Sequence, residues 1–139
     1  MIKGLGIDIV SIKRIEKMLI RWEDKFSNRV FTKNEISYCQ SKHYRASHFA
    51  ARFAAKEATY KVLGNHLEIL RWREIEVANQ ESGKPFLRLY GKTSSVARNT
   101  GIDILHISLS HSKEYAVAQV VGEGKEKNDT FISGGNEKS

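Results

Sequence analysis

The sequence predicts a single α+β domain, and three patterns carry that prediction. Apolar residues alternate with polar or small ones over residues 2–10, which is the period of a β-strand. Over about 47–63 the apolar side chains recur at helical spacing instead. Two further strand-like runs, at about 104–110 and 115–121, are joined by a short segment and predict a hairpin. At 139 residues and 40% hydrophobic content, the chain is long enough for one buried core.

The first strand is predicted to be followed directly by a helix. Along the strand, Leu5, Ile7 and Ile9 share one face, and Asp8 lies on the other. Ser11 is a suitable N-cap for the helix. The apolar stripe of that helix consists of Ile12, Ile15, Leu19 and Trp22. Farther along, the segment Thr32-Lys33-Asn34-Glu35 has the spacing of a capping box, so a second helix should begin at about Lys33.

The third helix, from about Ser47 to Leu63, is the clearest, and Gly64 is suited to end it. Ser82-Gly83-Lys84-Pro85 reads as a turn between two strands. Those strands are expected at 74–78 and 86–90, before a short helix at 92–99 that Gly101 closes. After Gly122 the composition turns polar, so the domain is assigned to residues 1–122 and a mobile C-terminal tail to 123–139.

Charge and composition restrict the function only broadly. The formal net charge of +7 and the pI near 9.6 favour an anionic partner, but nucleic acid, an acidic protein and a phosphorylated small molecule all qualify. Cys39 is the only cysteine, which excludes an internal disulfide and a cysteine-based zinc cluster. No apolar run is long enough to cross a bilayer, and Asp8 interrupts the N-terminal one. We therefore expect a cytoplasmic protein without a membrane partner.

Two carboxylates stand in apolar surroundings. Asp8 lies within a short apolar strand, where burial is costly unless a cation or hydrogen bonds compensate; a solvated strand face explains it equally well. Glu57 shares a helical stripe with Phe53, and Lys61 follows one turn later, so an ordinary i,i+4 ion pair is its simpler explanation. Together the two carboxylates suit Mg²⁺, with water and phosphate oxygens completing the shell. The flanking Lys56 and Lys61 could meet the remaining phosphate charge.

Other motifs carry less chemistry. His111 stands at the end of a strand, where a histidine is more often a surface residue than a catalytic one. Ser110 lacks the G-x-S-x-G setting of a serine hydrolase. Neither a P-loop nor a dinucleotide-binding glycine motif is present.

Three segments, taken together, resemble holo-[acyl-carrier-protein] synthase, the small bacterial type of 4′-phosphopantetheinyl transferase. The resemblance spans about residues 2–121, and its second segment is the most specific. The segments are Gly6-Ile7-Asp8-Ile9-Val10 with Arg14-Ile15; Arg52-Phe53-Ala54-Ala55-Lys56-Glu57-Ala58 with Lys61 and Leu63-Gly64; and Ser108-Leu109-Ser110-His111-Ser112 with Glu114-Tyr115-Ala116. Phe31-Thr32-Lys33-Asn34-Glu35 and Gly83-Lys84-Pro85 also resemble the family pattern.

The resemblance implies a fold, a reaction and a set of residues. The fold would be an antiparallel sheet packed against a long helix. The enzyme would transfer 4′-phosphopantetheine from coenzyme A to a serine of apo acyl carrier protein for fatty acid synthesis, releasing adenosine 3′,5′-bisphosphate. By position, Asp8 and Glu57 would hold Mg²⁺ and, with Lys61, serve catalysis. The residues expected to contact coenzyme A are Lys56, Lys61, Gly64, Lys84, Pro85 and His111, and those expected to contact the carrier protein are Arg14 and Arg21.

The resemblance also implies a homotrimer with active sites between subunits, in which the strands at 104–121 pack around the threefold axis. One point of mechanism stays open. The serine proton could be taken by Glu57 directly or by a metal-bound water. A basic charge serves in either case, because both substrates are anionic and attraction speeds their encounter.

Two rival functions use the same residues. A nucleic-acid-binding domain would explain the basic charge together with Trp22 and Trp72, but the basic residues are not interleaved with aromatics on one strand face. We therefore expect no nucleic-acid partner. A pyrophosphate hydrolase would keep the metal site and need no carrier protein. Release of adenosine bisphosphate from coenzyme A without a carrier would favour that hydrolase.

Overall fold

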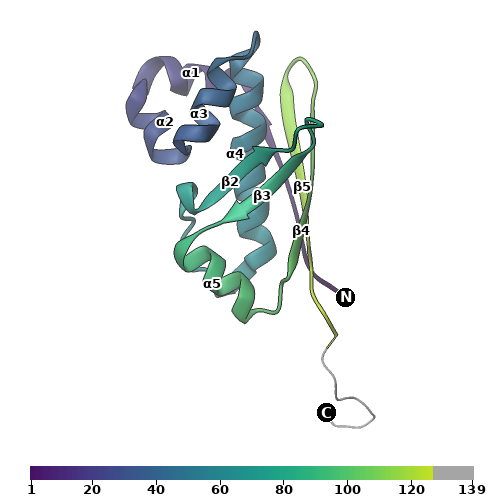
Figure 1. The fold of residues 1–139 in the computed structure, drawn as a ribbon. Coiled ribbons are helices and arrows are strands. Elements are labelled where there is room, and N and C mark those ends of the chain that lie inside the picture. The colour runs from purple at the N-terminus through teal and green to yellow at the C-terminus, as the bar shows by residue number, and fades with distance from the viewer. Residues whose placement is uncertain (127–139) are drawn as a thin grey trace.

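An antiparallel sheet forms one layer of the molecule in the computed structural model, which describes residues 1–126 (Figure 1). Its strands are β1 (Ile2–Ser11), β5 (Tyr115–Glu123) and β4 (Ile104–His111), in the spatial order β1-β5-β4. Each neighbouring pair is antiparallel. The predicted α+β class and antiparallel sheet are confirmed, with strand ends within two residues of those expected.

Five α-helices and a second hairpin complete the described chain. Figure 1 shows α4 running along one face of the sheet, with α1 to α3 gathered at one of its ends and α5 near the other. Among the residues described, no helix is both long and apolar enough to cross a membrane. The elements are α1 (Ile12–Trp22), α2 (Asp24–Val30), α3 (Lys33–Gln40), α4 (Arg45–Leu63), β2 (Ile75–Asn79), β3 (Pro85–Leu89) and α5 (Gly91–Asn99), with short 3₁₀ turns at Gly64–His66 and Trp72–Glu74.

Small residues let α4 lie directly on the sheet. Ala58 of α4 and Ala118 of β5 are fully buried. On β1, Gly6 approaches the helix so closely that a Cβ there would lie 2.0 Å from the carbonyl oxygen of Ala58. No side chain fits in that space, because the obstacle is backbone. Since alternate residues of a strand share a face, this contact also brings Asp8 against α4.

Local capping fixes where two helices begin. Ser11 Oγ accepts a hydrogen bond from Arg14 N at 3.2 Å, as the N-cap of α1 requires. At α3, Thr32 Oγ1 accepts from Glu35 N at 3.2 Å, and Thr32 N donates to Glu35 Oε1 at 2.9 Å. This is the reciprocal capping box that the sequence predicts, and both predicted helix starts are confirmed.

The segment between α1 and α3 was not predicted to be helical. Glu23 has φ 48°, which ends α1 and turns the chain into α2. The new helix buries Phe26, whose ring lies 5.9 Å from Phe31 and 6.3 Å from Phe53. Trp22 was expected on the apolar stripe of α1, but as the last residue of that helix it is 49% exposed.

One face of the sheet carries an uncovered apolar row along β1. Leu5, Ile7 and Ile9 of β1 are 66%, 59% and 61% exposed. The register places Val117 and Val121 of β5 beside them on the same face. Gln119 lies between those valines, and on β4 the same face carries His106, Ser108 and Ser110. The apolar part of this face is therefore the row on β1 and its β5 neighbours, and an exposed apolar row is typical of a surface that contacts another molecule.

The end of the domain lies slightly beyond the predicted boundary at Gly122. β5 continues through Glu123, and Gly124 pairs with the N-terminal residue, since Gly124 N donates to Met1 O at 2.9 Å and the Met1 amine donates to Gly124 O at 2.8 Å. The first residues of the predicted tail therefore belong to the folded domain. The remainder of that tail, 127–139, lies outside the described residues.

Candidate active site

Three of the predicted site residues meet where β1 crosses α4. Lys61 Nζ lies 3.3 Å from Asp8 Oδ1 and donates to the Ile7 carbonyl oxygen at 2.9 Å. Asp8 comes from the strand face that Gly6 brings against the helix. Glu57, one helical turn before Lys61, is near enough to Asp8 that the Asp8 charge raises its pKa. The structure thus brings together the strand carboxylate, the helix carboxylate and the lysine, as the sequence predicts.

The two carboxylates of this cluster repel each other. Burial raises the pKa of Glu57, and the nearby Asp8 carboxylate raises it further, while Lys61 and Arg14 act in the opposite direction. Two carboxylates that repel each other in a half-buried setting are stabilised by a cation between them. This is the electrostatic condition expected at a metal-binding site.

The donor set fits Mg²⁺ better than a metal held by protein alone. Within residues 1–126, no group of three or more His, Cys, Asp or Glu side chains is placed to hold a metal. Mg²⁺ commonly takes only one or two carboxylates and completes its octahedron with water and substrate phosphate oxygens. Asp8 and Glu57 therefore fit an ion whose remaining ligands arrive with a phosphorylated substrate.

Lys56, expected to contact phosphate, lies in the protein interior instead. Its side chain is fully buried, and Nζ lies 2.7 Å from Glu35 Oε1. The same amine donates to the Trp72 carbonyl oxygen at 2.9 Å and to that of Ile75. Burial lowers the pKa of Lys56, and Glu35 opposes that shift. With its amine committed to these partners, Lys56 cannot reach a substrate phosphate, so we assign it a structural role.

A second buried carboxylate extends this interior network. Glu76 Oε2 accepts from Thr32 Oγ1 at 2.6 Å and from Asn34 Nδ2 at 3.3 Å, and its Oε1 accepts from Tyr90 OH at 2.8 Å. Burial by itself would raise the pKa of Glu76, but these hydrogen bonds outweigh it and lower the pKa. Through Glu35 and Glu76 the network ties α3, α4 and the β2–β3 hairpin together.

Apart from Lys56 and Lys61, the residues predicted to contact coenzyme A lie at three places: the end of α4, the β2–β3 turn and the end of β4. Gly64, with φ 58°, ends α4 one turn after Lys61. Lys84 is exposed in the turn between β2 and β3, and Pro85 begins β3. Gly83 has φ 93° in that turn, and its carbonyl oxygen accepts from Asn79 Nδ2 at 2.9 Å. The predicted turn is confirmed, but no contact joins it to Asp8.

His111 lies two strands away from Asp8 of its own chain. Both His111 and Val10 pair with Ala116 of β5, and Asp8 lies two residues from Val10. Two strand spacings and two residue rises put the backbones of His111 and Asp8 about 12 Å apart. The His111 ring lies 6.3 Å from that of His48. Burial, and then Arg52, lower the pKa of His48.

Arg52 is a residue to which the sequence assigned no role. It is buried, its Nη2 donates to Asn79 Oδ1 at 2.8 Å, and its guanidinium lies 4.2 Å from the centre of the Tyr38 ring. Within the described chain Arg52 forms no salt bridge, and its Nε has no hydrogen-bond partner. A buried guanidinium without a carboxylate is suited to an anion. The sequence offered one signal, since Arg52 has no acidic residue within a helical turn.

The exposed side of α1 forms a basic groove of about 400 Å³. Arg14 and Arg21, the two residues predicted to contact a partner protein, lie on it together with apolar Met18 and Trp22. The Arg21 guanidinium lies 5.1 Å from the centre of the Trp22 ring. The groove is therefore lined by both positively charged and apolar side chains. The residues that line it are Ser11, Lys13, Arg14, Lys17, Met18, Arg21 and Trp22.

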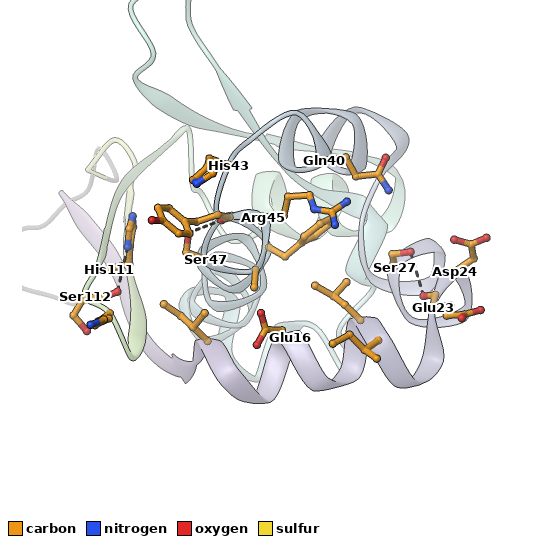
Figure 2. A pocket seen from close by; sticks show the side chains of 17 residues that line it. Glu16, Glu23, Asp24, Ser27, Gln40, His43, Arg45, Ser47, His111 and Ser112 are labelled. Atoms are coloured by element: carbon orange, nitrogen blue, oxygen red, sulfur yellow. Dashed lines mark hydrogen bonds between the residues drawn. The ribbon is translucent and has the colours of Figure 1, made fainter.

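A larger hollow, of about 1120 Å³, lies on a different side of α1 (Figure 2). Figure 2 shows His111 and Ser112 at one end of it and Glu23 and Asp24 at the other, with Glu16 on α1 between them. None of the Asp8, Glu57 and Lys61 side chains lines this hollow. The volume of a hollow therefore does not locate the candidate active site of this protein, because the charged cluster lies outside the larger hollow.

The sequence and the architecture match a known class of transferases. The family model described as the 4′-phosphopantetheinyl transferase superfamily matches residues 4–120. A holo-[acyl-carrier-protein] synthase of Halothermothrix orenii is 43% identical over 123 residues, covering 88% of this chain and 98% of the relative. One from Geobacter sp. (strain M21) is 46% identical over 122 residues, covering 87% and 98%. The chain therefore belongs to the holo-[acyl-carrier-protein] synthase family of this superfamily, whose members are enzymes.

Solved structures agree with this placement. The holo-(acyl-carrier-protein) synthase of Bacillus anthracis, in complex with CoA (3′,5′-ADP), is 40% identical with a TM-score of 0.71, covering 90% of this chain and 99% of that one. The Helicobacter pylori enzyme, in complex with coenzyme A, is 34% identical with a TM-score of 0.73, covering 86% and 99%. The predicted family is confirmed.

Proposed function

We propose that this protein transfers 4′-phosphopantetheine from coenzyme A to a serine of apo acyl carrier protein in a Mg²⁺-dependent reaction. Adenosine 3′,5′-bisphosphate is the second product, and the modified carrier serves fatty acid synthesis. The observation that carries the proposal is the cluster of Asp8, Glu57 and Lys61 where β1 crosses α4. Family membership and the coenzyme A complexes of two relatives support the choice of substrates.

Asp8 and Glu57 would hold the metal. When bound, Mg²⁺ withdraws negative charge from the pyrophosphate and helps to orient it for in-line attack. Lys61 adds a positive charge beside the same oxygens and so supports the leaving bisphosphate. The chain itself therefore contributes positioning and charge neutralisation, which are the main requirements of phosphoryl transfer.

The other predicted contacts would hold the remainder of coenzyme A. The β2–β3 turn offers Lys84 and Pro85, with the buried Arg52 connected to it through Asn79. His111 ends β4 and Gly64 ends α4. The two cations of the turn region, Lys84 and Arg52, suit a ligand that carries a second phosphate group in addition to its pyrophosphate.

The basic groove of α1 would receive the carrier protein. Arg14 and Arg21 offer charge to an acidic partner, and Met18 and Trp22 offer apolar contact between those charges. Arg14 also acts electrostatically on Glu57, so a partner in the groove lies next to the metal carboxylates. Arg14→Glu should raise the KM for the carrier at least tenfold and leave coenzyme A binding within about twofold. Equal effects on both substrates would contradict this docking role.

We also propose a homotrimer with active sites between subunits. Two features support it: the exposed apolar row of β1, and the strand register, which separates the backbones of His111 and Asp8 within one chain by about 12 Å. Burying each side chain of the Leu5, Ile7, Ile9 row would contribute roughly 1.5–3 kcal/mol. Light scattering should give three times the chain mass, and Ile7→Lys should give monomers. A wild-type monomer that is fully active would overturn this assembly.

The reaction can be tested by the mass of the carrier protein. Purified protein, coenzyme A, Mg²⁺ and an apo acyl carrier protein should yield a carrier heavier by one phosphopantetheine, and a chelator should abolish the change. If no adduct forms with several carriers, the transferase assignment is wrong. If adenosine bisphosphate appears at the same rate without a carrier, the protein is a pyrophosphate hydrolase.

A further inference from the structure

The ammonium group of Lys61 occupies the place where a cation would meet Asp8. Nζ lies 3.3 Å from Asp8 Oδ1, and a second hydrogen bond, to the Ile7 carbonyl oxygen at 2.9 Å, fixes it against the edge of β1. The Asp8 side chain is only 13% exposed, so few directions of approach to its oxygens remain. A divalent ion that bound Asp8 would therefore share this narrow space with the lysine.

Other cations of the described chain are not placed to take over this role. Lys56 is committed to Glu35 in the interior. Arg14 acts on Glu57 from a distance, and no salt bridge joins it to Asp8. Lys61 is thus the cation in direct contact with Asp8, and a bound metal ion would add two positive charges beside it. Like charges at this separation repel each other, so the lysine and the metal oppose each other at Asp8.

The lysine is also able to leave. Its side chain is 53% exposed, and the four-carbon stem of a lysine allows the ammonium to swing to another acceptor. A pyrophosphate beside the cluster supplies such acceptors, with a stronger charge than one aspartate. Movement of Lys61 onto phosphate would free Asp8 Oδ1 for the metal and keep the positive charge of the lysine within the site.

We propose that Lys61 is a built-in competitor of the metal ion, and that the substrate's pyrophosphate draws it away, so that metal and coenzyme A bind cooperatively. The proposal rests on the Asp8–Glu57 metal site of the proposed function. Coupling of this kind is reciprocal: coenzyme A strengthens metal binding by the same factor by which the metal strengthens coenzyme A binding. An uncharged side chain at residue 61 removes the competitor and the phosphate contact together.

The test measures metal binding rather than catalysis. Mn²⁺ is titrated into the full-length protein, and free Mn²⁺ is counted by its electron paramagnetic resonance signal, with and without saturating coenzyme A. The coupling is the ratio of the two dissociation constants. Lys61→Gln is compared with wild type and with two controls. Lys92→Gln, at an exposed position of α5, removes the same charge elsewhere, and Glu57→Gln is the control for the metal site.

In Lys61→Gln, Mn²⁺ alone should bind about threefold tighter than in wild type, since an ion pair with an exposed lysine is worth under 1 kcal/mol. With coenzyme A present, Mn²⁺ should bind about threefold weaker, so the coupling ratio falls about tenfold. Lys92→Gln should leave both constants unchanged.

Two results separate the possible failures. If Glu57→Gln weakens Mn²⁺ binding but Lys61→Gln leaves the coupling ratio at its wild-type value, the metal site stands and the competitor role of Lys61 is wrong. If wild type binds no Mn²⁺ with or without coenzyme A, the proposed metal site fails, and the inference fails with it.

Discussion

Lys56 and Glu57 are neighbours on α4, but they belong to two regions that differ in the charge beside them: Lys56 has a group of opposite charge as its partner, and Glu57 lies near a group of like charge. Lys56 points into the interior, where Glu35 and two backbone carbonyl oxygens satisfy its amine. Glu57 faces the half-exposed cluster with Asp8, where burial, and then the Asp8 carboxylate, raise its pKa. In the first region the buried amine has a carboxylate partner, and in the second two carboxylates repel each other while Lys61 contacts only Asp8.

This difference separates a structural role from a functional one. A buried group whose hydrogen bonds are all made leaves nothing for a ligand to satisfy, so its removal costs stability. A group held near a like charge gains a favourable partner only when a ligand arrives, so its removal costs binding and catalysis. We therefore expect substitutions in the Lys56 region to lower stability, and substitutions in the Asp8–Glu57 region to lower metal binding and activity with little loss of stability.

The largest change in stability is expected for Lys56→Met. The substitution leaves the buried Glu35 carboxylate without its cation, which should cost about 3–5 kcal/mol of unfolding free energy. Urea denaturation followed by circular dichroism measures it. Lys61→Gln, which removes a half-exposed lysine from the same helix, should cost less than about 1 kcal/mol. Equal losses in the two variants would contradict the distinction between the regions.

A smaller loss is expected for Gly6→Ala, which disturbs the contact on which the exposed cluster depends. Its Cβ would meet the Ala58 carbonyl oxygen, so the strand must move from the helix at a cost of about 1–3 kcal/mol. Gly122→Ala is the matched control, because the atom nearest its Cβ, at 2.8 Å, is a methyl group of the Val62 side chain and not backbone. Denaturation midpoints should rank wild type, Gly122→Ala, then Gly6→Ala. The reverse order would show that the backbone contact is not limiting.

Acid should weaken the Lys56 region through Glu76. Hydrogen bonds from Thr32, Tyr90 and Asn34 outweigh the effect of burial and lower the pKa of Glu76 below 4.5. A carboxyl group with a lowered pKa stabilises the fold fully above about pH 4.5, and this stabilisation is lost as the pH falls through its folded pKa. Glu76→Gln should therefore lose about 1–2 kcal/mol at pH 7 and show a shallower decline toward pH 3. Parallel pH profiles would disprove this role.

The smallest change in stability is expected for Glu57→Gln. Because the carboxylate is repelled by Asp8, its neutralisation should change the unfolding free energy by no more than about 0.5 kcal/mol. Thermal denaturation without metal provides the measurement. A loss of more than about 2 kcal/mol would place Glu57 in the structural region with Lys56.

The sequence predicted features that depend on local chemistry. Ser11 and Thr32 cap helices where expected, and the turn at Gly83 joins the expected strands. α2 was missed because the break at Glu23 depends on a positive φ at a non-glycine residue, and the helix is held by the burial of Phe26. Neither the positive φ at Glu23 nor the burial of Phe26 can be predicted from the neighbouring residues in the sequence.

The site was predictable to the extent that it follows from residue spacing. Asp8 and Glu57 stand out as carboxylates in apolar segments, and the structure brings them together with Lys61. The direction of Lys56 could not be read from the sequence, because Glu35, the residue that binds it, lies far away in the chain. The role of Arg52 depends in the same way on Asn79 and on burial.

The most direct measurement is carrier modification by Glu57→Gln beside that by wild type. Both proteins are incubated with coenzyme A, Mg²⁺ and apo acyl carrier protein, and the carrier is weighed by mass spectrometry at successive times. We predict that Glu57→Gln keeps wild-type stability and loses at least about a thousandfold in rate, since a metal carboxylate is missing. Transfer within about tenfold of wild type would contradict the assignment of Glu57 to the metal site.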